Sequence, residues 1–243
     1  MSALSKIAQA LQFSERMLPA RWRLPTRYGV QRLVGGLEPE MEILSDLLGP
    51  DDIAIDIGAN KGIYAYALAN VAQHVHCFEP LTECCDYIRA FRCNRITVHN
   101  CALSDAEGEF DLFIPVRNGR SVFTRASLKQ PGGSFQRRRI ELHRLDDFRL
   151  PRVDFIKIDV EGLESAVLRG ASATLRSCKP ALLVEIDRAR HSQATFEKLI
   201  EWLGTEGYKP HVLRGDSLRS SDDPWADAAI NFNFIFPKPA THP

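Results

Sequence analysis

The sequence has no net charge and no long apolar run. Its 31 Lys and Arg residues balance 31 Asp and Glu residues, so no overall electric field favours nucleic acid or another highly charged partner. No stretch approaches the roughly 18 apolar residues that are needed to span a bilayer. The N-terminal segment, which Lys6, Glu15 and Arg16 interrupt, also lacks the apolar region of a secretory signal. These absences predict a cytoplasmic protein without a transmembrane segment.

Paired cysteine motifs are absent as well. The six cysteines show no CxxC spacing and lie mostly inside apolar patterns, which argues against zinc and against disulfides. We expect them to be reduced and to act as small core side chains. With 44% hydrophobic and 26% charged residues, the chain is neither disordered nor fibrous. Its 243 residues fit one large domain.

Acidic side chains are missing from one long internal segment. Residues 112–140, here called the basic segment, contain seven Lys and Arg residues but no Asp or Glu. Gly119, Pro131 and Gly132 mark this segment as rich in loops. Its cations either form a solvated surface or hold an anionic ligand, for which arginine is well suited.

The N-terminal residues are also rich in arginine. Residues 1–36 contain six cations and one anion, and Pro19 and Pro25 interrupt their apolar positions. We predict that residues 1–37 form an Arg-rich helical cap, the N-terminal cap. Residues 38–243 would then form the main domain, which contains the basic segment.

From residue 38 onward, apolar strands alternate with helical patterns. Strands are expected at 52–57, 75–78, 96–100, 155–158 and 181–186, and helices at 38–48, 63–71, 81–91, 162–175 and 195–203. Strands that are apolar throughout and separated by helices form a parallel sheet covered on both faces. Two last strands, 211–213 and 231–236, have no clear helix between them and favour an antiparallel edge hairpin. The predicted fold class is therefore α/β, with a doubly wound, mostly parallel sheet of seven strands.

A loop with two glycines follows the first expected strand. Residues 56–62, here called the glycine loop, read Asp-Ile-Gly-Ala-Asn-Lys-Gly. Gly58 and Gly62 permit a sharp turn and a close approach of the backbone to a ligand, and open α/β sheets bind ligands at the carboxyl ends of their strands. A dinucleotide fingerprint would need glycine at the position of Asn60. The loop alone fits either a ligand site or a purely structural turn.

A carboxylate ends the second expected strand. Glu79 follows Phe78 and lies 23 residues after Asp56. A carboxylate in this place can accept hydrogen bonds from both ribose hydroxyls of a nucleoside, although it could instead cap the next helix. The glycine loop and the acid together favour a nucleoside ligand.

Further motifs accompany these two. They are Phe78-Glu79-Pro80, Asn100–Asp105 (NCALSD), Leu145-Asp146, Ile156–Glu164 (IKIDVEGLE) and Leu168–Ala171 (LRGA). In this combination the chain resembles the FkbM-type S-adenosylmethionine-dependent methyltransferases, a class I, Rossmann-like family, from about residue 38 to residue 237. The sequence departs from the family pattern at His143, and the N-terminal cap is not part of that pattern. The resemblance therefore does not identify the methyl acceptor.

The resemblance implies roles for residues at the carboxyl ends of the first four strands. Asp56, Gly58, Ala59, Asn60 and Gly62 would face the methionine part of S-adenosylmethionine, Glu79 and Pro80 the ribose, Ala102, Leu103, Ser104 and Asp105 the adenine, and Asp159 the amino group and the reacting methyl. Members of the family are O-methyltransferases that act on hydroxyls of sugars or of polyketide-like compounds.

Catalysis needs a group that activates the acceptor. An aliphatic hydroxyl is a poor nucleophile near neutral pH and requires a base, a metal or a strong hydrogen-bond acceptor. We predict Lys157, Asp159 and Glu161 as the catalytic residues, although Lys157 could simply form an ion pair. Alternative bases are His143 and His191.

A metal ion is a further way to activate the hydroxyl. Asp159, Glu185 and Asp187 offer oxygen ligands for Mg²⁺. Side chains of successive strand residues point to opposite faces, so Mg²⁺ is not favoured.

The sequence thus predicts an S-adenosylmethionine-dependent O-methyltransferase. Its partner would be a small-molecule or saccharide acceptor, such as a glycosylated natural product, and an anionic one if the basic segment binds it. A nucleic-acid methyltransferase is the first alternative, but the chain has no Asn-Pro-Pro or Asp-Pro-Pro run and few interleaved aromatics. The second alternative is a nucleoside-binding scaffold without catalysis.

Overall fold

The computed structural model describes residues 17–117, 120–121 and 132–239. Residues 1–16 of the N-terminal cap and much of the basic segment, including Arg125 and Lys129, lie outside the described residues. Among the residues that are described, no helix is both long enough and apolar enough to cross a bilayer.

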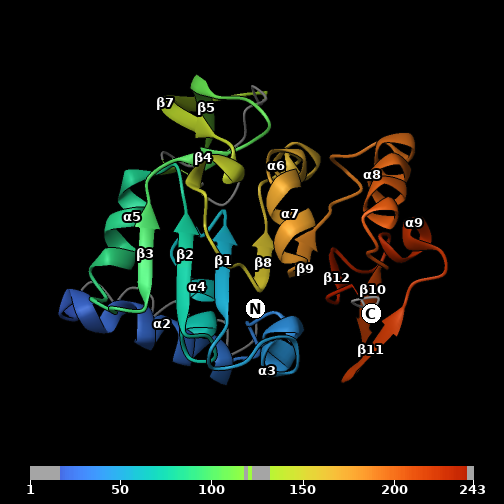
Figure 1. Ribbon diagram of the computed structural model, residues 1–243. Coiled ribbons are helices and arrows are strands. Elements are labelled where there is room, and N and C mark those ends of the chain that lie inside the picture. Colours follow the sequence, from blue (N-terminus) through green and yellow to red (C-terminus); the bar gives the residue numbers. More distant parts are fainter. Residues whose placement is uncertain (1–16, 118–119, 122–131, 240–243) are drawn as a thin grey trace.

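An eight-stranded sheet forms the centre of the molecule (Figure 1). Its strands are β1 (Ile53–Ile57), β2 (His74–Phe78), β3 (Ile96–His99), β8 (Phe155–Ile158), β9 (Ala181–Glu185), β10 (His211–Arg214), β11 (Ser217–Ser220) and β12 (Asn233–Phe236). The order is β3-β2-β1-β8-β9-β12-β10-β11. The first five of these strands are parallel, and the last three pair antiparallel.

The predicted α/β fold class is confirmed, but the number of strands is eight instead of seven. The additional strand is β11, which folds back on β10 at the sheet edge. It is short and largely exposed, so it has no apolar pattern by which the sequence could reveal it. The predicted antiparallel edge is present, because β12 pairs with both β9 and β10.

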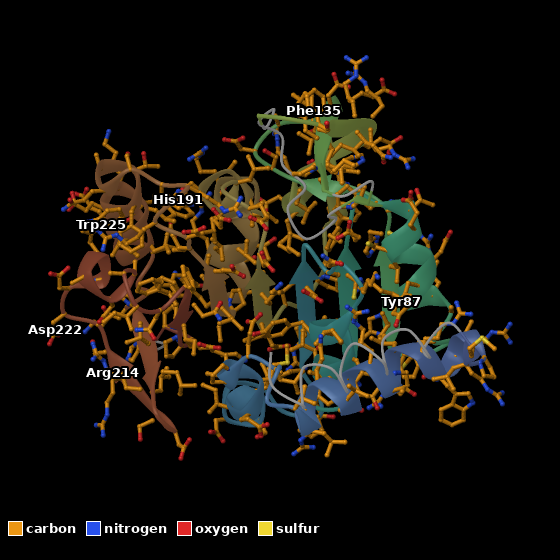
Figure 2. All side chains as sticks on the ribbon, turned by 180° about the vertical axis from the view of Figure 1, so that it is seen from behind. Tyr87, Phe135, His191, Arg214, Asp222 and Trp225 are labelled. Atoms are coloured by element: carbon orange, nitrogen blue, oxygen red, sulfur yellow. The ribbon has the colours of Figure 1, made fainter. Side chains whose placement is uncertain are left out.

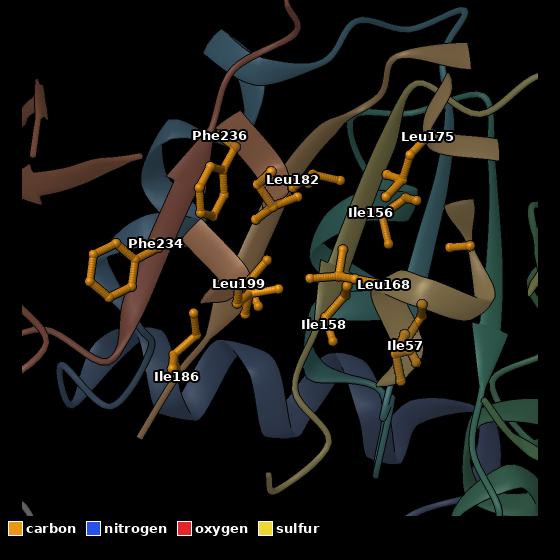
Figure 3. Close-up of a cluster of buried hydrophobic side chains, with 14 of the residues drawn as sticks. Ile57, Ile156, Ile158, Leu168, Leu175, Leu182, Ile186, Leu199, Phe234 and Phe236 are labelled. Atoms are coloured by element: carbon orange, nitrogen blue, oxygen red, sulfur yellow. The ribbon is translucent and has the colours of Figure 1, made fainter. Parts of the chain in front are cut away.

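Helices cover both faces of this sheet. One face packs against α4 (Ile63–Ala69) and α5 (Thr82–Arg89), and the other against α6 (Glu164–Gly170), α7 (Ser172–Cys178) and α8 (Gln193–Thr205). Side chains alternate between the faces along each strand. Ile156 therefore joins the cluster beneath α6 to α8 (Figure 3), whereas its neighbour Phe155 joins the opposite cluster. This packing makes the sheet doubly wound.

The chain enters the sheet through two short elements and one longer helix. Helix α2 (Ala20–Leu33) packs on α4 and α5 (Figure 2) and leads to a 3-10 helix, η2 (Pro39–Ile43), and to α3 (Leu44–Leu47). The expected interruption at Pro25 is wrong, because α2 continues through it. Leu24 is fully buried, and its packing offsets the backbone hydrogen bond that proline removes.

A second, four-stranded sheet contains the ends of the basic segment. Its strands are β4 (Ala102–Leu103), β5 (Gly108–Arg117), β6 (Arg120–Ser121) and β7 (Phe135–His143), in the order β4-β7-β5-β6. Strands β5 and β7 pair antiparallel along almost their whole length. The prediction that residues 112–140 are loop-rich is therefore wrong for both ends of that range. The start of α5, at Leu81 and Cys84, packs on four apolar side chains of β5 and β7: Leu112, Ile114, Ile140 and Leu142.

The arginines of β7 have acidic partners. Arg137 and Arg139 form ion pairs with Asp111, and Arg139 also pairs with Glu109. These partners precede residue 112, so the count over the basic segment missed them. Arg138 reaches Glu83 on α5.

Candidate functional site

The candidate site lies at the switch point of the large sheet, where the order of its strands reverses. Strands β1 and β8 are neighbours, and the chain leaves them toward opposite edges of the sheet, which is the place where open α/β sheets bind ligands. A cavity of about 230 Å³ lies there. It is lined by Gly58, Ala59, Asn60, Lys61, Ile63, Tyr64, Lys157 and Asp159, and by Arg27, Gln31, Gly36, Leu37, Glu38 and Met41 from the N-terminal part of the chain.

The glycine loop is held against the end of β8. Gly58 has a φ of 77°, and a Cβ atom there would lie 1.9 Å from the carbonyl oxygen of Asp159. Gly62 has a φ of 78°, and its Cβ would meet Ile88 at 2.8 Å. Both positions therefore require glycine because of the protein's own backbone and packing. The close approach at Gly58 joins the loop to Asp159.

Glu79 binds the backbone of the glycine loop through its carboxylate. Its carboxylate accepts hydrogen bonds from the backbone N–H of Asn60 at 2.8 Å and of Leu81 at 2.9 Å. The side chain is buried, and this burial raises the pKa of Glu79 to about 7 although the two N–H groups act in the opposite direction. Asn100, which was not among the predicted site residues, donates to the carbonyl oxygens of Glu79 and Pro80.

Residues 102–105, which were predicted near the adenine, connect the two sheets. Ser104 is buried, and its N–H donates to the carbonyl oxygen of His143 at 2.9 Å. Asp105 forms an ion pair with Arg169 on α6 at 2.8 Å. This segment therefore lies between α6 and the second sheet.

Lys157 forms the charged centre of the site. Its Nζ lies 3.2 Å from Asp159 and 3.7 Å from Asp56, and 4.8 Å from the ring centre of Tyr64. Although Lys157 is buried, the two carboxylates hold its pKa above the usual range. Burial raises the pKa of Asp56 to about 6, against the effect of Lys157. Neither carboxylate oxygen of Asp56 has a hydrogen-bond partner among the described residues.

Glu38 links three distant segments of the chain at this cavity through hydrogen bonds. Tyr64 donates a hydrogen bond to Glu38 at 2.6 Å, and Asn233 donates to the same oxygen at 3.1 Å. The sequence interpretation used Glu38 only as a helix start and did not single out Tyr64 or Asn233. No local signal marks them, because Glu38 and Asn233 are 195 residues apart.

The family model for the Methyltransferase FkbM domain matches residues 56–210. That range begins with the glycine loop and includes Lys157 and Asp159. The chain belongs to the FkbM methyltransferase family. The resemblance that the sequence motifs indicated is thereby confirmed.

Two relatives place this methyltransferase among known proteins. It is 28% identical over 171 residues to the 2-O-methyltransferase NoeI of Sinorhizobium fredii (strain NBRC 101917 / NGR234), covering 60% of this chain and 68% of NoeI. The crystal structure of methyltransferase FkbM from Methylobacillus flagellatus KT superposes with a TM-score of 0.50 at 19% identity, covering 91% of this chain. The match covers 59% of that longer chain, and it shows the shared fold.

Glu161 of the methyltransferase pairs with a residue of the loop that follows β9. Glu161 lies in the turn after β8 with a φ of 57°, and it forms an ion pair with Arg190 from the loop after β9. Arg190 also contacts Asp187 at 3.2 Å. An ion pair therefore links the loop after β8 to the loop after β9.

The two histidines that were considered as bases have other contacts. His191 is buried and lies 2.7 Å from Glu164, whose other oxygen accepts the N–H of Gly162 at 2.8 Å. His143 lies on β7, 3.5 Å from Glu141. Within the described ranges, no three His, Cys, Asp or Glu side chains are placed to hold a metal ion.

Proposed function

We propose that this methyltransferase uses S-adenosylmethionine to methylate a hydroxyl of a saccharide or of a glycosylated natural product. The observation that carries the proposal is the cavity at the switch point, which the glycine loop, Lys157 and Asp159 line. Methylation of a hydroxyl oxygen is supported by the name of the relative NoeI, a 2-O-methyltransferase. It is also supported by the acidic groups at the strand ends, which suit hydroxyl activation.

The residues at the site fit the proposed cofactor. Gly58, Ala59, Asn60 and Asp159, which the sequence assigned to it, line the cavity, and Asp56 offers two buried oxygens without hydrogen-bond partners among the described residues. These groups and Gly62 would hold the methionine part, Glu79 and Pro80 the ribose, and residues 102–105 the adenine. S-adenosylmethionine supplies an electrophilic methyl group on a positively charged sulfur, which suits an acidic site.

The protein's own groups would then position and activate the acceptor. Lys157 fixes the orientation of Asp159 through the 3.2 Å contact. The ion pair of Glu161 with Arg190 holds the acceptor side of the site in place. The cavity is closed on the side of the N-terminal cap by Gly36, Leu37, Glu38 and Met41, which would exclude water from the reacting atoms.

Two measurements test this function. Calorimetric titration with S-adenosylmethionine should show one site per chain, and a screen over sugar nucleotides and oligosaccharides should release S-adenosylhomocysteine with at least one acceptor. Absence of binding would contradict the cofactor assignment. Binding with turnover only on RNA or DNA would support the nucleic-acid alternative, and binding without any turnover would support the scaffold alternative.

A further inference from the structure

Glu185 lies beside Asp159 at the carboxyl edge of the sheet. Strands β8 and β9 are parallel with Ile158 opposite Val184, so the residues that follow this pair, Asp159 and Glu185, are neighbours. Side chains alternate along a strand. Glu185 therefore points to the same face as Lys157 and Asp159. On its other side, it is the register partner of Asn233 on β12.

The other carboxylates around Lys157 all have an ion-pair or a hydrogen-bond partner. Asp56 and Asp159 pair with Lys157, Glu38 accepts from Tyr64 and Asn233, and Glu161 pairs with Arg190. Glu185 is different. Its side chain makes no hydrogen bond or ion pair with any residue that the structure describes, although it is partly buried.

An unpartnered carboxylate in this place is available to a substrate. Protonation of a paired carboxylate weakens its ion pair or hydrogen bond to the protein, and this costs interaction energy. Glu185 has no such partner to lose. We propose that Glu185 is the general base that removes the proton from the acceptor hydroxyl, an assignment that rests on the proposed function.

The proton and the electrons balance in a single step. The hydroxyl gives its proton to the Glu185 carboxylate while its oxygen forms a bond to the methyl carbon. The carbon–sulfur bond breaks, and its electron pair goes to the sulfur, which becomes neutral. Glu185 then releases the proton to water, so that it is ionised again for the next acceptor.

The charges around Glu185 suit a base near neutral pH. Its surroundings contain Asp159, Glu38 and Glu161, which raise the pKa, and Lys157, which lowers it. Burial is the largest effect, and together they raise the pKa of Glu185 to about 8. A base whose pKa lies near the working pH combines a useful ionised fraction with proton affinity.

The first test is Glu185→Gln, which keeps the size of the side chain and removes the base. We expect kcat to fall about 100-fold or more, while the Kd of S-adenosylmethionine changes less than about twofold. Glu185→Asp should recover part of kcat. Glu201→Gln is the matched control, because Glu201 is exposed on α8 and should leave kcat unchanged. A Glu185→Gln enzyme with more than half of the wild-type kcat would overturn the proposal.

The second test does not depend on turnover. The folded pKa of Glu185 lies above that of the unfolded chain, so ionisation destabilises the folded state as pH rises through the folded value. Glu185→Gln should therefore raise Tm at pH 9 by about 2 to 4 °C and have a smaller effect at pH 5. A residue that only supports the structure would lower Tm at both pH values when replaced, and that result would overturn the assignment.

The two tests separate this proposal from the proposed function. If the wild-type protein binds no S-adenosylmethionine, the proposed function fails on its own measurement. If the wild type methylates an acceptor and Asp159→Asn abolishes kcat while Glu185→Gln retains it, only the assignment of Glu185 fails.

Discussion

At the scale of single residues, Gly58 shows how one position can serve fold and site together. Its φ is positive, and its Cα faces the carbonyl oxygen of Asp159 so closely that a Cβ would lie 1.9 Å away. The sequence suggested that a side chain here would block a ligand. In the structure the obstacle is the protein's own backbone at the end of β8. A substitution therefore affects folding before it affects binding.

We predict that Gly58→Ala lowers the free energy of unfolding by about 2 kcal/mol or more, through left-handed strain and the clash with Asp159. Chemical denaturation measures this. Gly204→Ala is the matched control, because a Cβ at Gly204 meets no atom within 4 Å and alanine favours the helical conformation of α8. The control should be neutral or stabilising by up to about 1 kcal/mol. A Gly58→Ala protein as stable as the control would contradict the prediction.

Glu79 is a second residue with two tasks. Glu79→Ala would leave the N–H groups of Asn60 and Leu81 without their acceptor, at about 1 to 3 kcal/mol of lost stability. The affinity for S-adenosylmethionine should also fall by about 10 to 100-fold, because the ribose would lose charged hydrogen bonds. Calorimetry gives the affinity, and thermal melting gives the stability. An unchanged Kd would remove Glu79 from the cofactor site.

Among the elements, the second sheet shows that the arginines at the end of the basic segment are paired with carboxylates. Strand β7 carries three consecutive arginines, and each has a carboxylate partner on β5 or α5. These pairs are exposed, and exposed pairs contribute little stability. What holds β5 and β7 on α5 is the apolar cluster beneath them. The arginines therefore form a solvated, ion-paired outer surface.

We predict that the triple change Arg137→Gln, Arg138→Gln and Arg139→Gln leaves the acceptor KM within about twofold at low salt. The reason is that each guanidinium already has a carboxylate partner. Stability should change by less than about 2 kcal/mol. Steady-state kinetics at two ionic strengths checks this. A clear rise in KM that disappears at high salt would instead show that the arginines bind an anionic acceptor.

For the whole molecule, buried acids and a partly buried histidine make the stability of the folded state depend on pH in opposite directions. Burial raises the folded pKa of Asp56, Glu79 and Glu185, so these acids lower the stability as pH rises. Burial has the opposite effect on His76, whose pKa falls to about 4. Its ring lies between His74 and His99 on β2 and β3, with the His76 and His99 nitrogens 3.2 Å apart.

We predict that His76 makes the wild type less stable in acid. The unfolded chain binds a proton near pH 6.5 and the folded chain only near pH 4, so the stabilisation present above pH 6.5 is lost as pH falls toward 4. Because the ring is only partly buried, the loss should be on the order of 1 kcal/mol. Denaturation of wild type and His76→Gln at pH 7.5 and pH 5 isolates this effect from the acids. Equal differences at both pH values would contradict it.

The parallel core and the residues that follow its strands can be predicted from local patterns in the chain. Apolar runs such as 181–184 are buried on both faces, so their composition alone identifies them as central strands. The glycine loop and Glu79 follow such strands directly, and a short motif therefore locates them. Local patterns carry this information because neighbouring residues in the chain remain neighbours in the strand and the turn.

Which of these residues lie together depends on contacts between segments that are distant in the chain. The contact of Gly58 with Asp159 crosses from one strand end to another, and Glu38 meets Asn233 across 195 residues. The isolation of Glu185 also depends on every side chain packed around it. Such pairings arise from sheet order and burial, and they leave no periodic signal in the chain. The acidic residues at the strand ends can therefore be identified in the sequence. Which of them can act as the base depends on which carboxylates are paired in the folded protein.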